Sequence, residues 1–262
     1  MGRYIFLILV ANLLVSCHGN YSEGEVLFRS GSYEKAISAF DTHLFLNSTD
    51  VKALQLRARA YEELEDYPNA LADYRKILKL EPNHAQAMAG IGKIHWKRED
   101  YRQAELYFLR AAKIDMDDFD ILLLLGRTLL INKNYKAADE FLQFAKELQP
   151  KDHRAYYYQG MARSQIGDLL GAAGSFNMCL IYDPENLPAK YNRGLILLNL
   201  GEAQWAMEDF DAVLKANPGH VEALARRGLS KQLLGLSEGC QDLLTAAKQG
   251  SSYAALHSQN CP

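Results

Sequence analysis

The sequence predicts an all-α protein made of repeated helix pairs, and three observations support this fold class. Small residues recur every 34 residues along most of the chain. Prolines and turn residues fall at matching intervals, where they would end helices. No segment shows the two-residue alternation of apolar and polar residues that is typical of a strand. A fixed period of this length indicates a repeat architecture, in which each unit packs mainly against its neighbours.

Three columns of residues define the repeat without an insertion or deletion. The first column is small and consists of Gly24, Ala58, Gly92, Gly126, Gly160, Gly194 and Gly228. The second is small up to its last member and consists of Ala36, Ala70, Ala104, Ala138, Ala172, Ala206 and Cys240. The third is aromatic or leucine and consists of Phe40, Tyr74, Phe108, Leu142, Phe176, Phe210 and Leu244. Small residues let two helix backbones approach each other, and the larger residue fills the space beside them.

These columns resemble the tetratricopeptide repeat family. The resemblance covers residues 17 to about 250 and places seven units with starts near 17, 51, 85, 119, 153, 187 and 221. It implies a right-handed superhelical solenoid of about seven helix pairs. It also implies that the first helices of the units line a concave groove, and that this groove binds a protein or peptide ligand.

The N-terminal segment has a different character from the repeats. Residues 5–15 form an apolar run of eleven residues, interrupted by Asn12, whereas a membrane-spanning helix needs roughly 20 apolar residues. With Arg3 before it and small residues after it, the run is typical of an export signal. We therefore expect residues 1–16 to be a signal peptide and exclude them from the fold.

The signal ends at a cysteine, and Leu14-Val15-Ser16-Cys17 resembles the bacterial lipobox. That resemblance implies that Cys17 is lipid-modified, with acyl chains such as palmitate, and becomes the first residue after cleavage. Two or more acyl chains anchor a protein stably, and His18 rather than aspartate after the cysteine favours the outer membrane. We expect a lipoprotein on that membrane, facing the periplasm. The alternative is an ordinary secretory signal that is cut later and releases a secreted, soluble repeat protein.

Charge bears on the kind of partner. Removal of residues 1–16 takes one of the 29 basic residues and none of the 32 acidic ones, so the net charge changes from −3 to −4. A general nucleic-acid binder would show a basic excess instead. We expect a protein or peptide ligand, contact with a membrane through the N-terminal lipid, and no nucleic acid.

In this family the groove is lined chiefly by positions 2, 5, 6, 9, 12 and 13 of each unit. Position 9 is basic in three adjacent units and apolar in the next three, where it reads Arg59, Lys93, Arg127, Met161, Leu195 and Leu229. The three cations could receive an acidic segment. The alternative is an ordinary solvated face near Glu62 and Glu63.

The first helix of the fourth unit reads DILLLLGRTLLIN and is apolar on every side, so we expect it to be covered on every side. Two interpretations stay open: an exposed docking surface, or side chains that pack against each other. In this helix the groove-facing residues would be Leu123, Leu124, Leu130 and Ile131. The full predicted groove comprises Arg59, Lys93, Trp96, Leu123, Leu124, Arg127, Tyr157, Tyr158 and Tyr191.

The last unit leaves an apolar face that needs a cap, and residues 251–262 would supply it as a short helix. The spacing of GCQDLL and NC is similar to the ending of exported bacterial repeat proteins of this family. It implies a disulfide between Cys240 and Cys261, which would contribute on the order of 3 kcal/mol. The alternative is two unpaired thiols. Cys179 falls at a buried column, where we expect a small core residue.

Signs of chemistry are weak. GLSEG at 235–239 matches a hydrolase nucleophile elbow, but that motif needs a strand before the serine, and here a helix precedes Ser237. We therefore expect Ser237 at a helix N-cap, and a serine hydrolase is the alternative from another functional class. No two histidines have the i, i+4 spacing of metal ligands, and no CxxC occurs. We expect no catalytic residue, cofactor or metal, and a non-enzymatic scaffold that acts as an assembly or adaptor factor.

Overall fold

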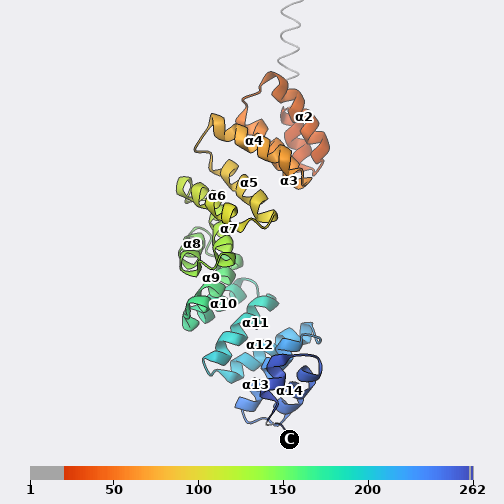
Figure 1. The fold of residues 1–262 in the computed structure, drawn as a ribbon, viewed down its shortest axis with the longest axis vertical. Helices are drawn as coiled ribbons and strands as arrows, with labels where there is room; N and C mark the ends of the chain where they lie inside the picture. The colour runs from red at the N-terminus through yellow and green to blue at the C-terminus, as the bar shows by residue number, and fades with distance from the viewer. Residues whose placement is uncertain (1–20, 260, 262) are drawn as a thin grey trace, which may run out of the picture. The chain divides into compact units, whose positions relative to one another are not determined.

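The computed structural model describes residues 21–259 and 261, and all regular structure in this part of the chain is helical (Figure 1). The chain forms two compact units. Unit 1 ends at Ile121 and unit 2 begins at Leu122. The prediction of an all-α protein is confirmed.

Unit 1 consists of helix pairs in chain order. Residues 21–29 are helical and precede α2 (Tyr33–Leu46), α3 (Val51–Glu63), α4 (Tyr67–Leu80), α5 (Ala85–Lys97) and α6 (Tyr101–Ile114). Helix α3 packs against α4 and α5 against α6, and contacts between α4 and α5 join one pair to the next. Helix α7 (Phe119–Ile131) begins in unit 1 and continues into unit 2.

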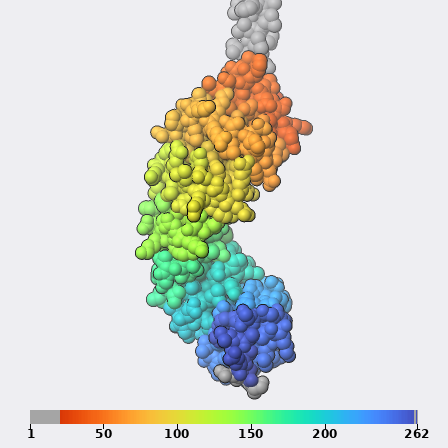
Figure 2. Space-filling view, in the orientation of Figure 1, coloured from red at the N-terminus to blue at the C-terminus, as the bar shows by residue number. Residues whose placement is uncertain are grey.

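Unit 2 continues the same pattern. Its helices are α8 (Tyr135–Leu148), α9 (His153–Ile166), α10 (Leu169–Tyr182), α11 (Leu187–Asn199), α12 (Ala203–Ala216), α13 (Val221–Leu233), α14 (Glu238–Lys248) and α15 (Ser252–His257). In the space-filling view the colours of this unit change in chain order from green through cyan to blue (Figure 2). The first helices of the units begin at residues 51, 85, 119, 153, 187 and 221, where the period predicts them.

The small residues of the first column lie directly against the large residues of the third. A Cβ atom added to Gly92 would come within 2.7 Å of the ring of Phe108, and one on Gly160 within 2.8 Å of Phe176. Both rings are almost fully buried. Glycine is therefore required at these two positions because the ring of the second helix already fills the space.

The seventh unit departs from the predicted columns by one residue. A Cβ atom on Gly228 would lie 2.9 Å from Leu243, and one on Gly239 would lie 2.7 Å from the carbonyl oxygen of Gly228. Leu243 is fully buried, whereas Leu244 is 38% exposed. The predicted assignment of Cys240 and Leu244 to these columns is therefore wrong, because this unit is one residue shorter between its two contact positions. The shift frees Cys240 from the packing between α13 and α14.

The C-terminal segment covers the last helix pair. Helix α15 packs against both α13 and α14, and Ala254 joins the buried cluster of Leu243 and Ala246. Cys240 and Cys261 form a disulfide with their Cα atoms 5.4 Å apart. The side-chain amide of Gln232 donates to both sulfur atoms, at 3.2 and 3.3 Å. The disulfide thus fastens the end of the chain to the second helix of the last unit.

Cys179 is a buried free thiol in α10. Burial raises its pKa to about 11, and the nearby carboxylate of Asp183 acts in the same direction. A thiol that stays protonated in this way is a poor nucleophile and behaves as a small apolar residue.

Candidate functional site

A hollow of about 370 Å³ lies in unit 2 on the face formed by the first helices α7, α9 and α11. Residues from α8 and α10 complete its floor. Its lining consists of Leu130, Tyr135, Met161, Ser164, Gln165, Phe176, Asn192, Leu195 and Ile196. Six of these nine occupy repeat positions 6, 9, 12 and 13, the positions that the family resemblance assigns to the groove. We refer to this surface as the first-helix face.

The first-helix face combines an apolar floor with amide side chains. Phe176 is almost fully buried beneath it, and Met161 and Leu195 are half-buried. The amide of Asn192 donates to the hydroxyl of Tyr157 at 3.4 Å, which links the hollow to the neighbouring tyrosine. An apolar floor with a few fixed polar groups suits a bound side chain that carries its peptide backbone past the rim.

A pair of tyrosines lies beside the hollow. The rings of Tyr157 and Tyr158 meet edge to face at 5.3 Å, and Tyr157 also contacts Phe176 at 6.0 Å. The guanidinium of Arg127 lies 5.1 Å from the centre of the Tyr158 ring. Burial raises the pKa of Tyr157 above its usual value. The structure therefore brings three of the predicted groove residues, Arg127, Tyr157 and Tyr158, together.

Some apolar residues of helix α7 are buried and others lie at the surface. Each of the two interpretations of its apolar sequence, mutual packing and an exposed surface, therefore holds for part of the helix. Leu123 is only 3% exposed, so it offers almost no surface to a ligand. A helix that is apolar all round is covered on most sides, and Leu123 lies on a covered side. Leu124 and Leu130 are half-buried and Ile131 is 42% exposed, so these residues remain at the surface.

Tyr191 packs against other side chains of unit 2 more than it lines a binding surface. Its ring contacts Phe210 at 5.9 Å and His220 at 5.0 Å, and it is half-buried in the cluster around Phe210. Burial raises its pKa, while the positive charge of Arg226 opposes that change. Substitution of Tyr191 would therefore disturb the fold as well as any bound ligand.

The predicted groove residues of unit 1 have a different environment. Arg59 is exposed, with its guanidinium 5.0 Å from the ring centre of Phe28, and Lys93 is also exposed. Burial raises the pKa of Glu62, while the charges of Lys93 and Arg59 oppose the rise. Both cations thus lie close enough to act on an acidic neighbour, which favours the solvated face over a receptor for acidic ligands.

Trp96 is half-buried in unit 1 and meets Tyr101 edge to face at 5.9 Å. Of the three predicted cations, Arg127 belongs to unit 2, where its guanidinium lies over the ring of Tyr158.

Ser237 lies in the turn between α13 and α14, at the N-cap position of α14, and is exposed. A helix precedes it, which is the wrong context for a nucleophile elbow. Its hydroxyl lies 3.4 Å from a carboxylate oxygen of Glu238 and does not cap the helix. The expected N-cap position is observed, but the expected capping bond is not.

Within residues 21–259 and 261, no group of three or more acidic, histidine or cysteine side chains is placed to hold a metal ion. None of the described helices combines the length and apolar character of a membrane span. Cys17 and the predicted signal peptide lie outside the described residues.

Sequence reasoning missed a set of arginines at position 7 of the units. The guanidinium of Arg193 donates two hydrogen bonds to Asp209, at 2.8 and 2.6 Å, and a third to Asn177 at 2.7 Å. Each such arginine lies on the first helix of its unit. It connects the second helix of the same unit to the second helix of the preceding unit. The same arrangement links Arg57 to Asp73 and Asp41, and Arg227 to Asp242 and Asp211. The spacing of 16 residues between Arg and Asp in two of the units was the available signal.

Comparison with known sequences identifies the repeat. A sequence pattern described as "Tetratricopeptide repeat" matches residues 56–119 and 95–152, and a second pattern of the same description matches 187–220. Tetratricopeptide repeat protein 8 of Caenorhabditis elegans is 24% identical over 153 residues, which are 58% of this chain and 30% of that protein. DnaJ homolog subfamily C member 3 of Gallus gallus is 25% identical over 123 residues, 47% of this chain and 24% of that protein. The chain thus spans less than a third of these relatives.

Solved structures show the same fold. The crystal structure of YrrB, described as "a TPR protein with an unusual peptide-binding site", is 29% identical with a TM-score of 0.66. The match covers 71% of this chain and 96% of YrrB. Pseudomonas aeruginosa pilF has a TM-score of 0.64 at 17% identity, over 79% of this chain and 96% of that structure.

Proposed function

Because this chain belongs to the tetratricopeptide repeat family, we propose that it is a non-enzymatic scaffold which holds a partner protein on the first-helix face of unit 2. Proteins of this family bind protein or peptide partners, and the repeats make this chain a protein–protein interaction scaffold. One observation carries the choice of surface. The hollow of about 370 Å³ is lined mainly by residues at the groove positions of the first helices.

The chemistry of the hollow defines the expected ligand. Leu130, Met161 and Leu195 offer an apolar recess, and Asn192 and Gln165 offer amide groups at the same site. A peptide segment with one large apolar side chain would place that side chain in the recess and its backbone beside the amides. Apolar anchors in such recesses usually account for most of the binding free energy of an interface.

Selection of peptides from a random display library on the purified chain provides ligands with which to test this surface. Met161→Glu places a charge in the recess, so we expect it to weaken the selected peptides at least tenfold in a fluorescence-anisotropy titration. Leu170→Glu is the matched control, since Leu170 lies on α10 and is 75% exposed. Equal loss of affinity in both variants, or no loss in either, would contradict the proposed surface.

We further propose that the scaffold is a lipoprotein, anchored through Cys17 to the outer membrane and facing the periplasm. The support is the apolar run at residues 5–15 followed by Leu14-Val15-Ser16-Cys17. The disulfide between Cys240 and Cys261 is consistent with this proposal, because disulfides persist in oxidising compartments such as the periplasm.

Cell fractionation tests the anchor. Cys17→Ala should move the protein from the outer-membrane fraction to the soluble fraction, and Cys179→Ala, which changes a buried thiol, should leave it in place. Mass spectrometry of the mature N-terminus distinguishes a lipid-modified Cys17 from the secreted, soluble alternative. An unmodified N-terminus beyond residue 17 would overturn the anchor and leave the scaffold proposal standing.

A further inference from the structure

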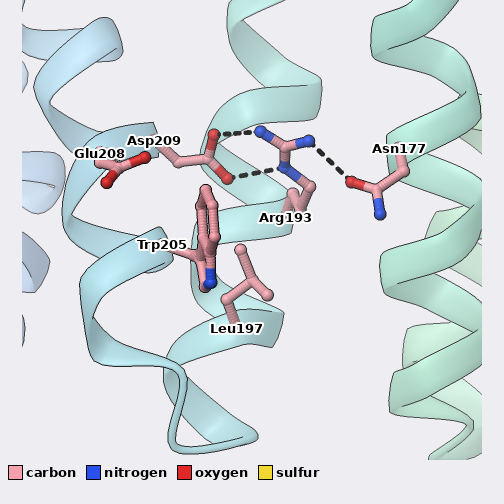
Figure 3. Close-up of a pocket in the computed structure, with 6 residues that line it drawn as sticks. All are labelled: Asn177, Arg193, Leu197, Trp205, Glu208 and Asp209. Carbon is pink, nitrogen blue, oxygen red and sulfur yellow. Dashed lines mark hydrogen bonds and ion pairs between the residues drawn. The ribbon is translucent and has the colours of Figure 1, made fainter.

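A second hollow, of about 440 Å³, lies in unit 2 where α10, α11 and α12 meet (Figure 3). All of its lining residues come from repeat positions that do not occur in the lining of the first-helix face, and the two hollows share no lining residue. Its lining comprises Asn177, Arg193, Leu197, Trp205, Glu208 and Asp209. We refer to it as the Trp205 hollow.

The hollow depends on the residue at position 11 of the unit. In the unit before, Arg163 at that position pairs with Asp139 at 2.8 Å, and in the unit after, Lys231 pairs with Asp242 at 2.8 Å. Leu197 is shorter and uncharged, and it leaves room beside the indole of Trp205. Trp205 is 61% exposed, which is unusual for so large an apolar side chain.

The charged side chains of the Trp205 hollow differ in their hydrogen-bond partners within the protein. The guanidinium of Arg193 donates hydrogen bonds to Asp209 and Asn177, as the dashed lines in Figure 3 show. Burial raises the pKa of Asp209, while the hydrogen bonds from Arg193 and the charge of Lys190 oppose the rise. Glu208 lies at the exposed rim and accepts a hydrogen bond from Gln204 at 3.0 Å.

These groups leave the lining with one positive and two negative residues, and the negative charge nearest solvent is Glu208. An anionic ligand would meet that carboxylate and find the arginine already paired. A cation would find a carboxylate, an aromatic face and an apolar wall in one place. Trp is the side chain that attracts cations most strongly through its ring.

We propose that the Trp205 hollow binds a lysine or arginine side chain of a partner protein. The cationic group lies over the indole of Trp205, with Glu208 as its counter-ion, and the aliphatic part of the side chain rests on Leu197. The acidic net charge of the chain, −3, favours approach of a basic segment. Since the two hollows share no lining residue, this inference stands or falls separately from the proposed first-helix face.

Tryptophan fluorescence provides a direct test, because the chain contains only two tryptophans, Trp96 and Trp205. In a Trp96→Phe background the emission reports on Trp205 alone. The probe is the peptide acetyl-Gly-Leu-Arg-Leu-Gly-amide, and the control is the same peptide with citrulline, the neutral isostere of arginine. We expect a saturable change with the arginine peptide and at least tenfold weaker binding of the citrulline peptide. Equal binding of the two peptides would overturn the proposal.

Two variants assign the binding to the named residues. Glu208→Gln should weaken the arginine peptide about fivefold, the factor that corresponds to roughly one exposed ion pair. Glu140→Gln is the matched control, since Glu140 occupies the same repeat position two units earlier, where Ala137 stands in place of Trp205. Unchanged affinity in Glu208→Gln, or an equal loss in Glu140→Gln, would contradict the role of Glu208.

Trp205→Ala, followed by calorimetry and with its helicity checked by circular dichroism, should abolish binding of the arginine peptide. Retained binding would place the peptide elsewhere and overturn the proposal. A second copy of the chain is the other possible occupant. Self-association that rises with protein concentration and disappears in Trp205→Ala would assign the hollow to a dimer contact and would likewise overturn it.

Discussion

In the turns inside the helix pairs, the choice of a single residue affects the stability of the fold. Seven turn positions, spaced by 34 residues, adopt a positive φ, and four of them are Gly31, Gly167, Gly201 and Gly235. The other three are Glu65, Glu99 and Lys133, with φ between 57° and 63°. An L-residue in this region brings its Cβ too close to the carbonyl oxygen, at roughly 1–2 kcal/mol. The 34-residue period predicts where these turns lie. It does not predict a positive φ at the three turns that lack glycine, because Glu and Lys do not indicate that conformation.

Glu65→Gly should therefore stabilise the protein. The side chain of Glu65 is exposed, so its loss removes little packing, and the relief of the left-handed backbone outweighs the added freedom of the unfolded chain. We expect the free energy of unfolding in urea to rise by roughly 0.5–1 kcal/mol. Gly201→Ala, at φ 85° in the equivalent turn, should lower it. A fall in stability for Glu65→Gly would contradict this account.

Two glycines inside helices should respond to alanine in opposite directions. A Cβ atom on Gly90 would lie 2.3 Å from the ring of Tyr74, whereas one on Gly174 would have no neighbour within 4 Å. Gly90→Ala should lower the free energy of unfolding by roughly 1–3 kcal/mol through overpacking. Gly174→Ala should raise it by up to about 1 kcal/mol through helix propensity. Thermal melts of both variants decide the point, and equal effects would refute the packing argument.

At the scale of elements, paired helices are joined by the partly buried arginine–aspartate contacts as well as by the aromatic column. Arg227 donates two hydrogen bonds to Asp242, at 2.7 and 2.9 Å, and Lys231 adds a third at 2.8 Å. Burial alone would raise the pKa of Asp242, but these hydrogen bonds outweigh it and lower the pKa below its usual value of 3.8. The contact between α13 and α14 is therefore sensitive to acid.

Asp242→Asn tests this contact. Because the folded pKa is lowered, the carboxylate contributes stability above pH 3.8 and loses that contribution as the pH falls through and below 3.8. The variant should lose about 2 kcal/mol at pH 7, less than a fully buried pair because the contact is partly solvated. Urea unfolding from pH 7 to pH 3 should also show a flatter pH dependence. Asp211→Asn, an exposed partner of Arg227, should lose only about 0.5 kcal/mol, and equal losses would contradict the argument.

The disulfide has an element-scale consequence at the cap. It closes a loop across a sequence separation of 21 residues, so Cys261→Ser should lower the free energy of unfolding by about 3 kcal/mol. The loss should be concentrated in α13, α14 and α15, with faster amide hydrogen exchange there than in unit 1. A reducing agent should reproduce the effect in the wild type and add nothing in the variant. Uniform exchange along the chain would contradict a local role.

The 34-residue period predicted the positions of most helices but not every contact within them. Helix starts from α3 to α13 follow the 34-residue register because each unit repeats the same packing. The register failed in the seventh unit, since Cys240 and Leu244 fit the columns as well as the actual contacts, Gly239 and Leu243. The burial of Leu123 could not be predicted either, because an all-apolar helix carries no pattern that tells its covered side from its open side.

At the scale of the whole molecule, the candidate binding surfaces follow repeat positions only in part. Six of the nine residues that line the hollow of the first-helix face occupy groove positions of the family, but none of the nine residues predicted for the groove is among the lining residues. The Trp205 hollow could not be predicted, since it depends on one leucine at a position that carries long polar side chains in the flanking units. A difference between otherwise equivalent units therefore marks the Trp205 hollow.

The central claim is that the first-helix face of unit 2 holds a partner protein, and site-specific photo-crosslinking in living cells tests it most directly. A photoreactive amino acid at Gln165, which lines the hollow, should yield a discrete adduct of higher mass than the chain alone. The same group at exposed Leu170 on α10 should not yield that adduct. An adduct of equal yield at Leu170, or none at Gln165 when the protein is abundant and folded, would contradict the claim.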